Sequence, residues 1–429
     1  MTAEVAIANK TAVALAADSA VSIGPTADKI YTSALKIFQL VEGAPVGIMV
    51  SGDAEFLGIP WETIIKAYRE KRGRGHLAKL IDYRDDFLEF VETHEKLFPT
   101  ELQDRYVDKL IESYFRYVLK LIKDETDKLV KRGDQITTDE TTNLIQDVVF
   151  KEQNRVAQAN RLDAFNEEVI RRIRRSFVRR VNRIKEEVFL GLPLSDRTSR
   201  MLTNLTFDLL SRSEMGAMHS GLAFAGFGDD EYLPRIYSVA LEIMFNNRIR
   251  WHEEDRYEVN EEQEDIAAII PFAQADMVDA FMQGIHPQID QNRFITVKTV
   301  LETFVDRIAA ITEQEHLQLG IQLRANFAEC VQSILSDIKT DWQLQSEEHA
   351  TPVILNVSVL PKDELGAMAE SLANLTKFRL RVSLERETVS GPIDVAIISK
   401  GDGFVWLKRK HYFQAELNPR VVSEYDRRI

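Results

Sequence analysis

The sequence predicts a mixed α+β protein, and two contrasts along the chain support this fold class. Short apolar runs separated by turn residues fill positions 1–70 and return after residue 221, which is typical of antiparallel strands. Between about 71 and 213 glycine becomes scarce, and apolar residues recur at helical spacing. We therefore expect a β-rich domain made of residues 2–70 and 214–429, with residues 71–213 inserted into it as a helical arm.

The start of the chain predicts a β-hairpin, because two apolar runs flank the polar pair Asn9-Lys10. Removal of Met1 would make Thr2 the N-terminal residue. Its free α-amino group, which titrates near pH ~8, would then lie beside its own hydroxyl and could act as its general base. A Met-Thr start is equally compatible with an ordinary strand, so this hypothesis depends on the rest of the chain.

Hydrophobic spacing predicts the remaining elements. Strands are expected at 34–40 and 46–50, and helical spacing follows from 56 to 68. Two apolar stripes mark long helices in the arm: Leu102, Tyr106, Leu110, Tyr114, Val118 and Ile122, and then Ile170, Ile173, Phe177, Val181, Ile184 and Val188. Beyond the arm we expect strands at 222–230, 234–241 and 353–360, helices at 274–284, 296–311, 319–342 and 362–377, and a closing hairpin of 393–399 and 404–408.

The composition narrows the classes of function. A net charge of −14 argues against bulk attraction to nucleic acid or to an anionic membrane. No run approaches the ~20 apolar residues of a membrane-spanning helix, and the start does not have the pattern of a signal peptide. Cys330 is the only cysteine, which excludes an internal disulfide and favours the reducing cytoplasm. The scattered histidines show no metal-ligand spacing, so we expect neither a metal nor a cofactor.

One helix of the arm is strongly basic opposite its apolar stripe. Such a face could bind RNA, DNA or an acidic partner, and it consists of Arg171, Arg172, Arg174, Arg175, Arg179, Arg180, Arg183 and Lys185. Glutamates on either side dilute this charge, and most charge-rich helix faces are only solvated. We therefore favour a solvated face over a nucleic-acid site.

Three local motifs resemble proteasome β subunits and the HslV-type peptidase, within the N-terminal-nucleophile hydrolases. The first is Thr2 followed by Leu15-Ala16-Ala17-Asp18-Ser19. The second is the segment from Lys36-Ile37 to Ser51-Gly52-Asp53-Ala54, and the third is Ser390-Gly391-Pro392 with the strand after it. The resemblance covers roughly residues 2–70, 221–241 and 268–408. It implies the family's four-layer αββα sandwich, in which two antiparallel sheets lie between helices, with the large all-helical insertion added.

The resemblance also implies a role for each matching residue. Thr2 would be the nucleophile, and Lys36 would lower the barrier to deprotonating it. Asp18 would orient Lys36 and compensate its charge, because an unpaired buried charge is costly. The backbone N–H of Gly52 would stabilise the oxyanion, where one donor contributes ~3 kcal/mol.

Glu387 and Ser390 fall where the family places an Asp and a Ser that support the N-terminal amine. Glu387 is one methylene longer than that Asp. A second departure concerns the Ser-Gly-rich loop before the family's third helix. If residues 271–275 begin that helix, Ala268 stands in place of the serine, and Ile269-Ile270 in place of the glycines.

The function that these resemblances imply is hydrolysis of peptide or amide bonds through an acyl-enzyme on Thr2. The family implies a homo-oligomeric ring, and any ATP-driven unfoldase would be a separate chain, since no ATP-binding motif occurs here. The alternatives are a catalytically inactive scaffold that binds partners through its helical arm, and an amidase acting on small molecules.

Overall fold

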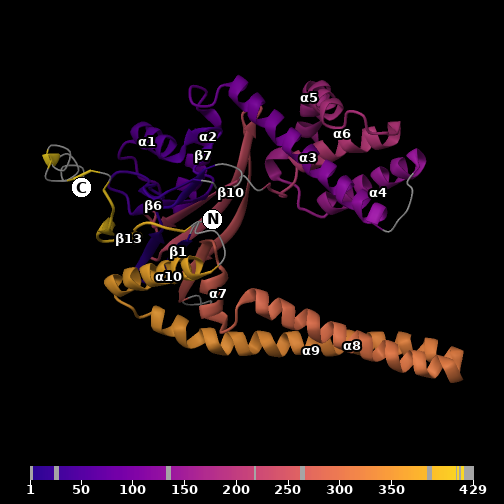
Figure 1. Cartoon of the computed structure of the whole chain (residues 1–429). Helices are drawn as coiled ribbons and strands as arrows, with labels where there is room; N and C mark the ends of the chain where they lie inside the picture. The colour runs from indigo at the N-terminus through magenta and orange to yellow at the C-terminus, as the bar shows by residue number, and fades with distance from the viewer. Residues whose placement is uncertain are drawn as a thin grey trace. The chain divides into compact units, whose positions relative to one another are not determined.

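The computed structural model describes residues 3–23, 29–131, 137–216, 219–260, 266–383, 389–411, 413–414 and 417–419. The chain divides into two compact units, and Figure 1 labels most of their elements. The first unit combines Met1–Ile37, Tyr232–Arg235 and Glu258–Ile429, and the second combines Phe38–Glu231 and Ile236–Tyr257. The fold class is mixed α+β, as predicted, with one five-stranded sheet in each unit.

The sheet of the first unit has the strand order β12-β1-β2-β13-β14, and all four neighbouring pairs are antiparallel. Its strands are β1 (Ala3–Asn9), β2 (Ala12–Ala17), β12 (Ala267–Ala273), β13 (Asp394–Ser399) and β14 (Gly403–Lys408). The predicted N-terminal and C-terminal hairpins are both confirmed. The Asn9 side chain stabilises the first turn, because its Oδ1 accepts hydrogen bonds from the Thr11 and Ala12 amides. A short pair, β3 (Val21–Ile23) and β4 (Lys29–Tyr31), forms a separate ribbon.

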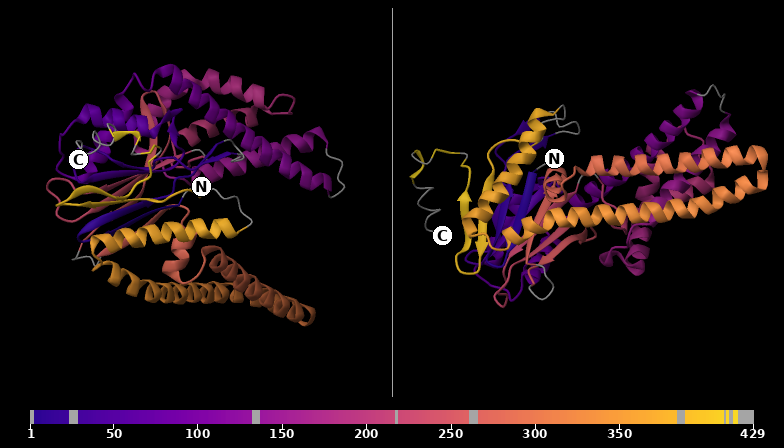
Figure 2. Two further views of the ribbon diagram at one scale, coloured as in Figure 1. Left: turned by 60° about the vertical axis from the view of Figure 1, so that its left-hand side comes forward. Right: turned by 90° about the horizontal axis from the view of Figure 1, so that it is seen from below.

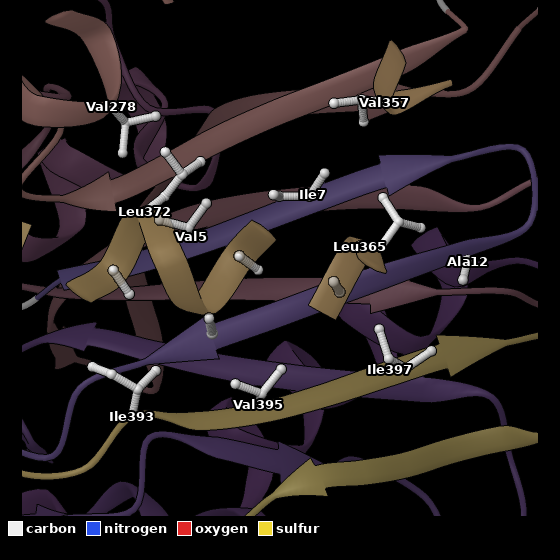
Figure 3. Packing of buried hydrophobic residues seen from close by; sticks show 14 of the residues in the cluster. Val5, Ile7, Ala12, Val278, Val357, Leu365, Leu372, Ile393, Val395 and Ile397 are labelled. Atoms are coloured by element: carbon white, nitrogen blue, oxygen red, sulfur yellow. The ribbon is translucent and has the colours of Figure 1, made fainter. Parts of the chain in front are cut away.

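One face of this sheet is covered by α10 (Lys362–Val382), as Figure 3 shows. Side chains alternate across a strand, so every second residue of β1 faces this helix. Val5 and Ile7 therefore pack with Leu365 and Leu372 in one buried cluster. The intervening residues of β1, Glu4 among them, lie on the opposite face of the sheet.

Before α10, the chain forms α7 (Asp276–Gln283) and then the two longest helices of this unit, α8 (Pro287–Glu315) and α9 (Leu317–Val357). These two run side by side as an antiparallel hairpin (Figure 2). The strand predicted at 353–360 is wrong, because residues 353–357 continue α9. A short apolar run does not distinguish a strand from a buried helix end. Here Val353, Ile354 and Val357 pack against the core of the sheet.

The sheet of the second unit has the order β11-β10-β9-β6-β5. Its strands are β5 (Ile37–Gln39), β6 (Val46–Gly52), β9 (Ser220–Gly226), β10 (Arg235–Phe245) and β11 (Arg248–Glu258). β6 and β9 are antiparallel. The β10–β11 turn consists of Asn246 and Asn247, both with positive φ, which is typical of a tight hairpin.

The helices of this unit are α1 (Trp61–Arg72), α2 (Leu80–Thr93), α3 (Thr100–Lys131), α4 (Thr138–Ala157), α5 (Glu167–Val188) and α6 (Asp196–Leu210), with a short 3₁₀ turn at Asp163–Phe165. The helix predicted from residue 56 begins later, because β7 (Glu55–Phe56) and β8 (Ile59–Pro60) form a small hairpin first. In α5 the predicted stripe is confirmed at Ile173, Phe177, Val181 and Ile184, all buried. In α3 the buried stripe is partly displaced, to Gln103, Val107, Ile111, Phe115, Val118 and Ile122, since strict four-residue spacing drifts against 3.6 residues per turn.

The described helices include none long and apolar enough to cross a membrane.

Candidate active site

Asp18 follows β2 directly and is buried, with 1% of its surface exposed. It exchanges two hydrogen bonds with the start of β1: the Ala3 amide donates to Asp18 Oδ1 at 3.1 Å, and the Asp18 amide donates to the Ala3 carbonyl at 3.0 Å. Its second carboxylate oxygen accepts from the Ala20 amide at 3.0 Å and from the Ser390 amide at 3.1 Å. One carboxylate therefore joins the start of β1, the residues after β2 and the distant segment at Ser390.

Lys36 immediately precedes β5, and only 5% of its surface is exposed. Its Nζ lies 2.6 Å from Asp18 Oδ1, the oxygen that also accepts from Ala3, and 3.5 Å from Glu4 Oε1. Removing an ammonium from water costs several kcal/mol unless charged partners surround it. The two carboxylates supply that compensation and hold a buried cation beside the first described residue of β1.

Ser390 and Gly391 form a segment that contacts Asp18 and Ser19 through hydrogen bonds of the Ser390 backbone. The Ser390 carbonyl accepts a hydrogen bond from the Ser19 amide at 3.2 Å, in addition to the bond from its own amide to Asp18. Gly391 has φ +81°, and a Cβ there would lie 2.9 Å from Thr32 Cβ and 3.0 Å from the Thr32 carbonyl oxygen. Only glycine fits this turn without strain, which accounts for the Ser-Gly motif.

The structure brings further charged residues to this site that the motifs did not indicate. Glu4 is buried in β1, and Asp394 is buried at the start of β13. Lys410 binds Asp394 twice: its amide donates to Asp394 Oδ1 at 2.8 Å, and its ammonium pairs with Oδ2. Burial lowers the pKa of Lys410, an effect that Asp394 opposes and the positive charge of Lys36 reinforces. The available signal was Glu4 itself, a charged residue inside an apolar strand.

Gly52 belongs to the second unit, where it ends β6 opposite Ser220 of β9. Its φ is +71°, and a Cβ at this position would lie 2.4 Å from the His219 carbonyl oxygen. The next amide, of Asp53, donates to that same carbonyl at 3.0 Å. Burial raises the pKa of Asp53, although the backbone N–H groups of Glu55 and Ala54 oppose this shift. The geometry therefore requires glycine at position 52.

Thr2 and Glu387 lie outside the described residues. The prediction of a loop around Ala268 is wrong. Ala268 lies inside β12 opposite Ala8, and Pro271 is still part of that strand, so the predicted start of a helix at 271–275 is wrong. The strand ends at Ala273, opposite Ala3, and α7 begins at Asp276. The short loop next to the start of β1 is therefore Gln274-Ala275, and Ala268 has no place in it.

This arrangement can stabilise negative charge close to the start of β1. A fixed, buried ammonium favours deprotonation of a neighbouring hydroxyl and stabilises the oxyanion that results. Within the described part of the chain, no group of three or more His, Cys, Asp or Glu residues is placed to hold a metal ion.

No protein-family model matches the sequence, and no curated protein matches it either. Among solved structures, one similar chain is the Anbu (Gly-1) mutant from Hyphomicrobium sp. strain MC1. The comparison gives a TM-score of 0.28 and 10% sequence identity, and it covers 100% of this chain and 97% of that one. Similarity at this level does not assign the chain to a family.

Proposed function

We propose that this chain is a proteasome-like N-terminal threonine hydrolase that cleaves peptide or amide bonds after removal of Met1. The observation that carries the proposal is the hydrogen bond from the Ala3 amide to Asp18 Oδ1, the oxygen that also binds the Lys36 ammonium. Thr2 immediately precedes Ala3 in the chain. A nucleophile at residue 2 would therefore directly precede the residue whose amide binds the buried Lys36–Asp18 pair.

In the proposed reaction, the Thr2 hydroxyl attacks the substrate carbonyl while its α-amine accepts the proton through a water molecule. Lys36 stabilises the developing alkoxide, and Asp18 holds Lys36 in place. The resemblance to the family assigns the oxyanion donor to the N–H of Gly52. Collapse of the intermediate breaks the C–N bond, the amine leaves with a proton, and water then hydrolyses the ester on Thr2. Ser390 and Glu387 support the α-amine.

We extend the proposal to the family's four-layer αββα sandwich, to a cytoplasmic location and to a homo-oligomer that takes peptide or protein substrates. Large apolar side chains exposed along α8 and α9 support assembly, among them Phe304, 57% exposed, and Ile311, 66% exposed. A separate ATP-driven unfoldase would supply folded substrates.

Labelling with a threonine-directed epoxyketone tests the mechanism. The purified wild type should lose Met1 by intact mass and then gain one inhibitor mass, whereas Thr2→Ala should not be labelled. Thr340→Ala is the matched control, since Thr340 is an exposed residue of α9, and it should be labelled like the wild type. Retention of Met1, or equal labelling of wild type and Thr2→Ala, would count against the proposal.

Turnover of peptides compared with small amides would separate a protease from an amidase.

A catalytically inactive scaffold is the second candidate, and the basic face of α5 favours it. Arg171, Arg172, Arg175 and Arg179 are exposed on one helix, where they could bind an acidic partner. Part of this face is already neutralised, since Arg172 pairs with Glu168, and Arg180 and Arg183 form ion pairs with Asp104 and Asp108 of α3. Binding of an acidic protein that Arg171→Glu and Arg175→Glu abolish, without any labelling of Thr2, would support the scaffold.

A further inference from the structure

Two exposed residues at the end of β6 are bound by a buried pair of polar side chains. Gly52 and Asp53 are exposed, whereas Ser220 and Trp61 are each only 2% exposed. The indole N–H of Trp61 donates to Ser220 Oγ at 2.9 Å, and the Ser220 hydroxyl donates to the Asp53 carbonyl at 3.0 Å. Because an indole N–H can only donate, the hydroxyl must accept from it and direct its own proton to the backbone. The mechanism above uses neither side chain.

Two backbone hydrogen bonds hold the same turn. The Asp53 amide donates to the His219 carbonyl at 3.0 Å, and the Trp61 amide donates to the Ala54 carbonyl at 3.1 Å. Both polar backbone groups of Asp53, and the carbonyl after them, are therefore bound within the second unit. Trp61 is held in turn by its ring, which stacks on Phe56 with 5.3 Å between the centroids.

The strand register gives the direction of the Gly52 N–H. Opposite residues of antiparallel strands alternate between pairs that exchange hydrogen bonds and pairs that do not. Gly52 lies opposite Ser220, and in the next pair the Asp53 amide donates to the His219 carbonyl. Gly52 and Ser220 therefore form a non-bonded pair, so the Gly52 N–H points away from β9 and takes no part in the β6–β9 ladder.

The glycine at position 52 makes this support necessary. Glycine is the only residue that fits there, yet it is also the residue with the greatest backbone freedom. An N–H that stabilises an oxyanion must keep its direction, since a displacement of about 1 Å can cost about 10²-fold in rate. The hydrogen bonds on the residues after the glycine restrict that freedom.

We propose that Ser220 is a positioning residue of the active site: its hydroxyl, oriented by the Trp61 indole, holds the Asp53 carbonyl and thereby fixes the direction of the Gly52 N–H. This inference rests on the proposed function, in which that N–H is the oxyanion donor. Ser220 acts through the backbone of Asp53 and not by contact with the substrate.

The test is epoxyketone labelling of the full chain over a range of inhibitor concentrations, below the Tm of each variant. This separates inhibitor binding, KI, from the rate of the covalent step, kinact. Ser220→Ala should lower kinact about tenfold and leave KI unchanged, because the donor, whose removal costs about 10²–10³-fold, is displaced and not removed. Trp61→Phe keeps an aromatic ring without the N–H and should lower kinact by a smaller factor. Ser211→Ala is the matched control, since it removes an equally buried hydroxyl, 2% exposed, after α6, and it should change neither constant.

A purely structural role for the hydroxyl would lower the Tm of Ser220→Ala and leave kinact equal to that of Ser211→Ala, and that result overturns the proposal. A change confined to KI also overturns it. The double variant of Ser220→Ala with Trp61→Phe should have the kinact of Ser220→Ala alone, because both act through one hydroxyl, whereas additive losses contradict this coupling. Wild type that is not labelled at any concentration overturns the threonine mechanism together with this inference. Labelled wild type with an unaffected Ser220→Ala overturns this inference alone.

Hydrogen exchange of the Asp53 amide provides a readout without catalysis. Ser220→Ala should speed this exchange about fivefold, the factor that corresponds to about 1 kcal/mol for one hydrogen bond. Ser211→Ala should leave it at the wild-type rate. Equal exchange in the two variants would show that the hydroxyl does not hold the turn, and it would overturn the proposal.

Discussion

The Asp18 carboxylate binds Lys36 through the same oxygen that fixes the start of β1. Asp18 Oδ1 lies 2.6 Å from Lys36 Nζ and 3.1 Å from the Ala3 nitrogen. A single side chain therefore couples the position of a buried cation to the position of the chain's first strand. Loss of this carboxylate should therefore lower both the free energy of unfolding and the labelling of Thr2. A residue with a purely structural role would affect only the first.

Asp18→Asn should lower the free energy of unfolding by about 3 kcal/mol, because among the described carboxylates the amide leaves the Lys36 ammonium with the more distant Glu4. It should also abolish labelling of Thr2. Urea unfolding measures the first effect and intact mass the second. Glu62→Gln, which breaks the exposed pair of Glu62 with Lys66, should cost less than about 0.5 kcal/mol. Equal losses in the two variants would contradict the role of burial.

Gly52→Ala should destabilise the protein by more than about 2 kcal/mol and abolish labelling. The new Cβ would approach the His219 carbonyl to 2.4 Å at a φ of +71°, so strain and a backbone clash combine. Gly73→Ala separates these two terms, because Gly73 has φ +62° with nothing within 4 Å of its Cβ position. Because Gly73 has ψ −135°, outside the left-handed helical region, that control should cost about 1–3 kcal/mol through backbone strain alone and keep full labelling. If both variants behave alike in urea, the clash at position 52 is absent.

The pH dependence of stability should include a contribution from His252 of β11. Burial lowers its pKa from 6.5, and the charge of Arg250 lowers it further. The unfolded chain therefore binds the proton first as the pH falls below 6.5, so the stability contribution is complete above that pH and is lost on acidification. His252→Gln should reduce the fall in Tm between pH 7.5 and 5.5 by about 1 °C, a small effect because the residue is only partly buried. The exposed His349→Gln serves as control and should reproduce the wild-type curve.

The sequence predicted the parts of the site that local motifs encode. The Ala-Ala-Asp-Ser and Ser-Gly segments pointed to Asp18 and Ser390, and the structure brings them together with Lys36. Glu4 was missed although it is a charged residue inside an apolar strand. Asp394, and Lys410 that binds it, were missed because Asp394 reaches the site through the pairing of β13 with β2, which joins segments hundreds of residues apart. The same cause misplaced Ala268, which an ungapped comparison put in a loop although β12 continues to Ala273.

The prediction of secondary structure was wrong where the local conformational propensity of a segment competes with tertiary packing. Residues 353–357 have the composition of a strand, yet α9 continues through them, and a proline at position 352 lies inside that helix. The apolar side chains of Val353 and Val357 pack against the hydrophobic core of the first unit. Burial, and not β-propensity, therefore decides that this segment is helical. The length of α8 and α9 was likewise underestimated, since their apolar residues are spread over more than one face.

This spread of apolar residues predicts self-association through the α8–α9 hairpin. Its inner seam already buries Val305, Val331 and Leu335, while Phe304 and Ile311 remain more than half exposed. A two-helix hairpin can cover only one stripe of each helix, so further exposed apolar residues indicate a surface that a second copy of the chain would cover.

The double variant Phe304→Asp with Ile311→Asp should therefore shift the mass in solution from a multiple of 49.1 kDa toward the monomer, measured by analytical ultracentrifugation. Both substitutions fall outside the buried seam, so the helices should keep their circular dichroism signal. Leu190→Asp places the same charge at another exposed apolar position, 86% accessible and outside the hairpin, and should leave the mass unchanged. A wild type that sediments as a monomer at all concentrations would refute assembly through this surface.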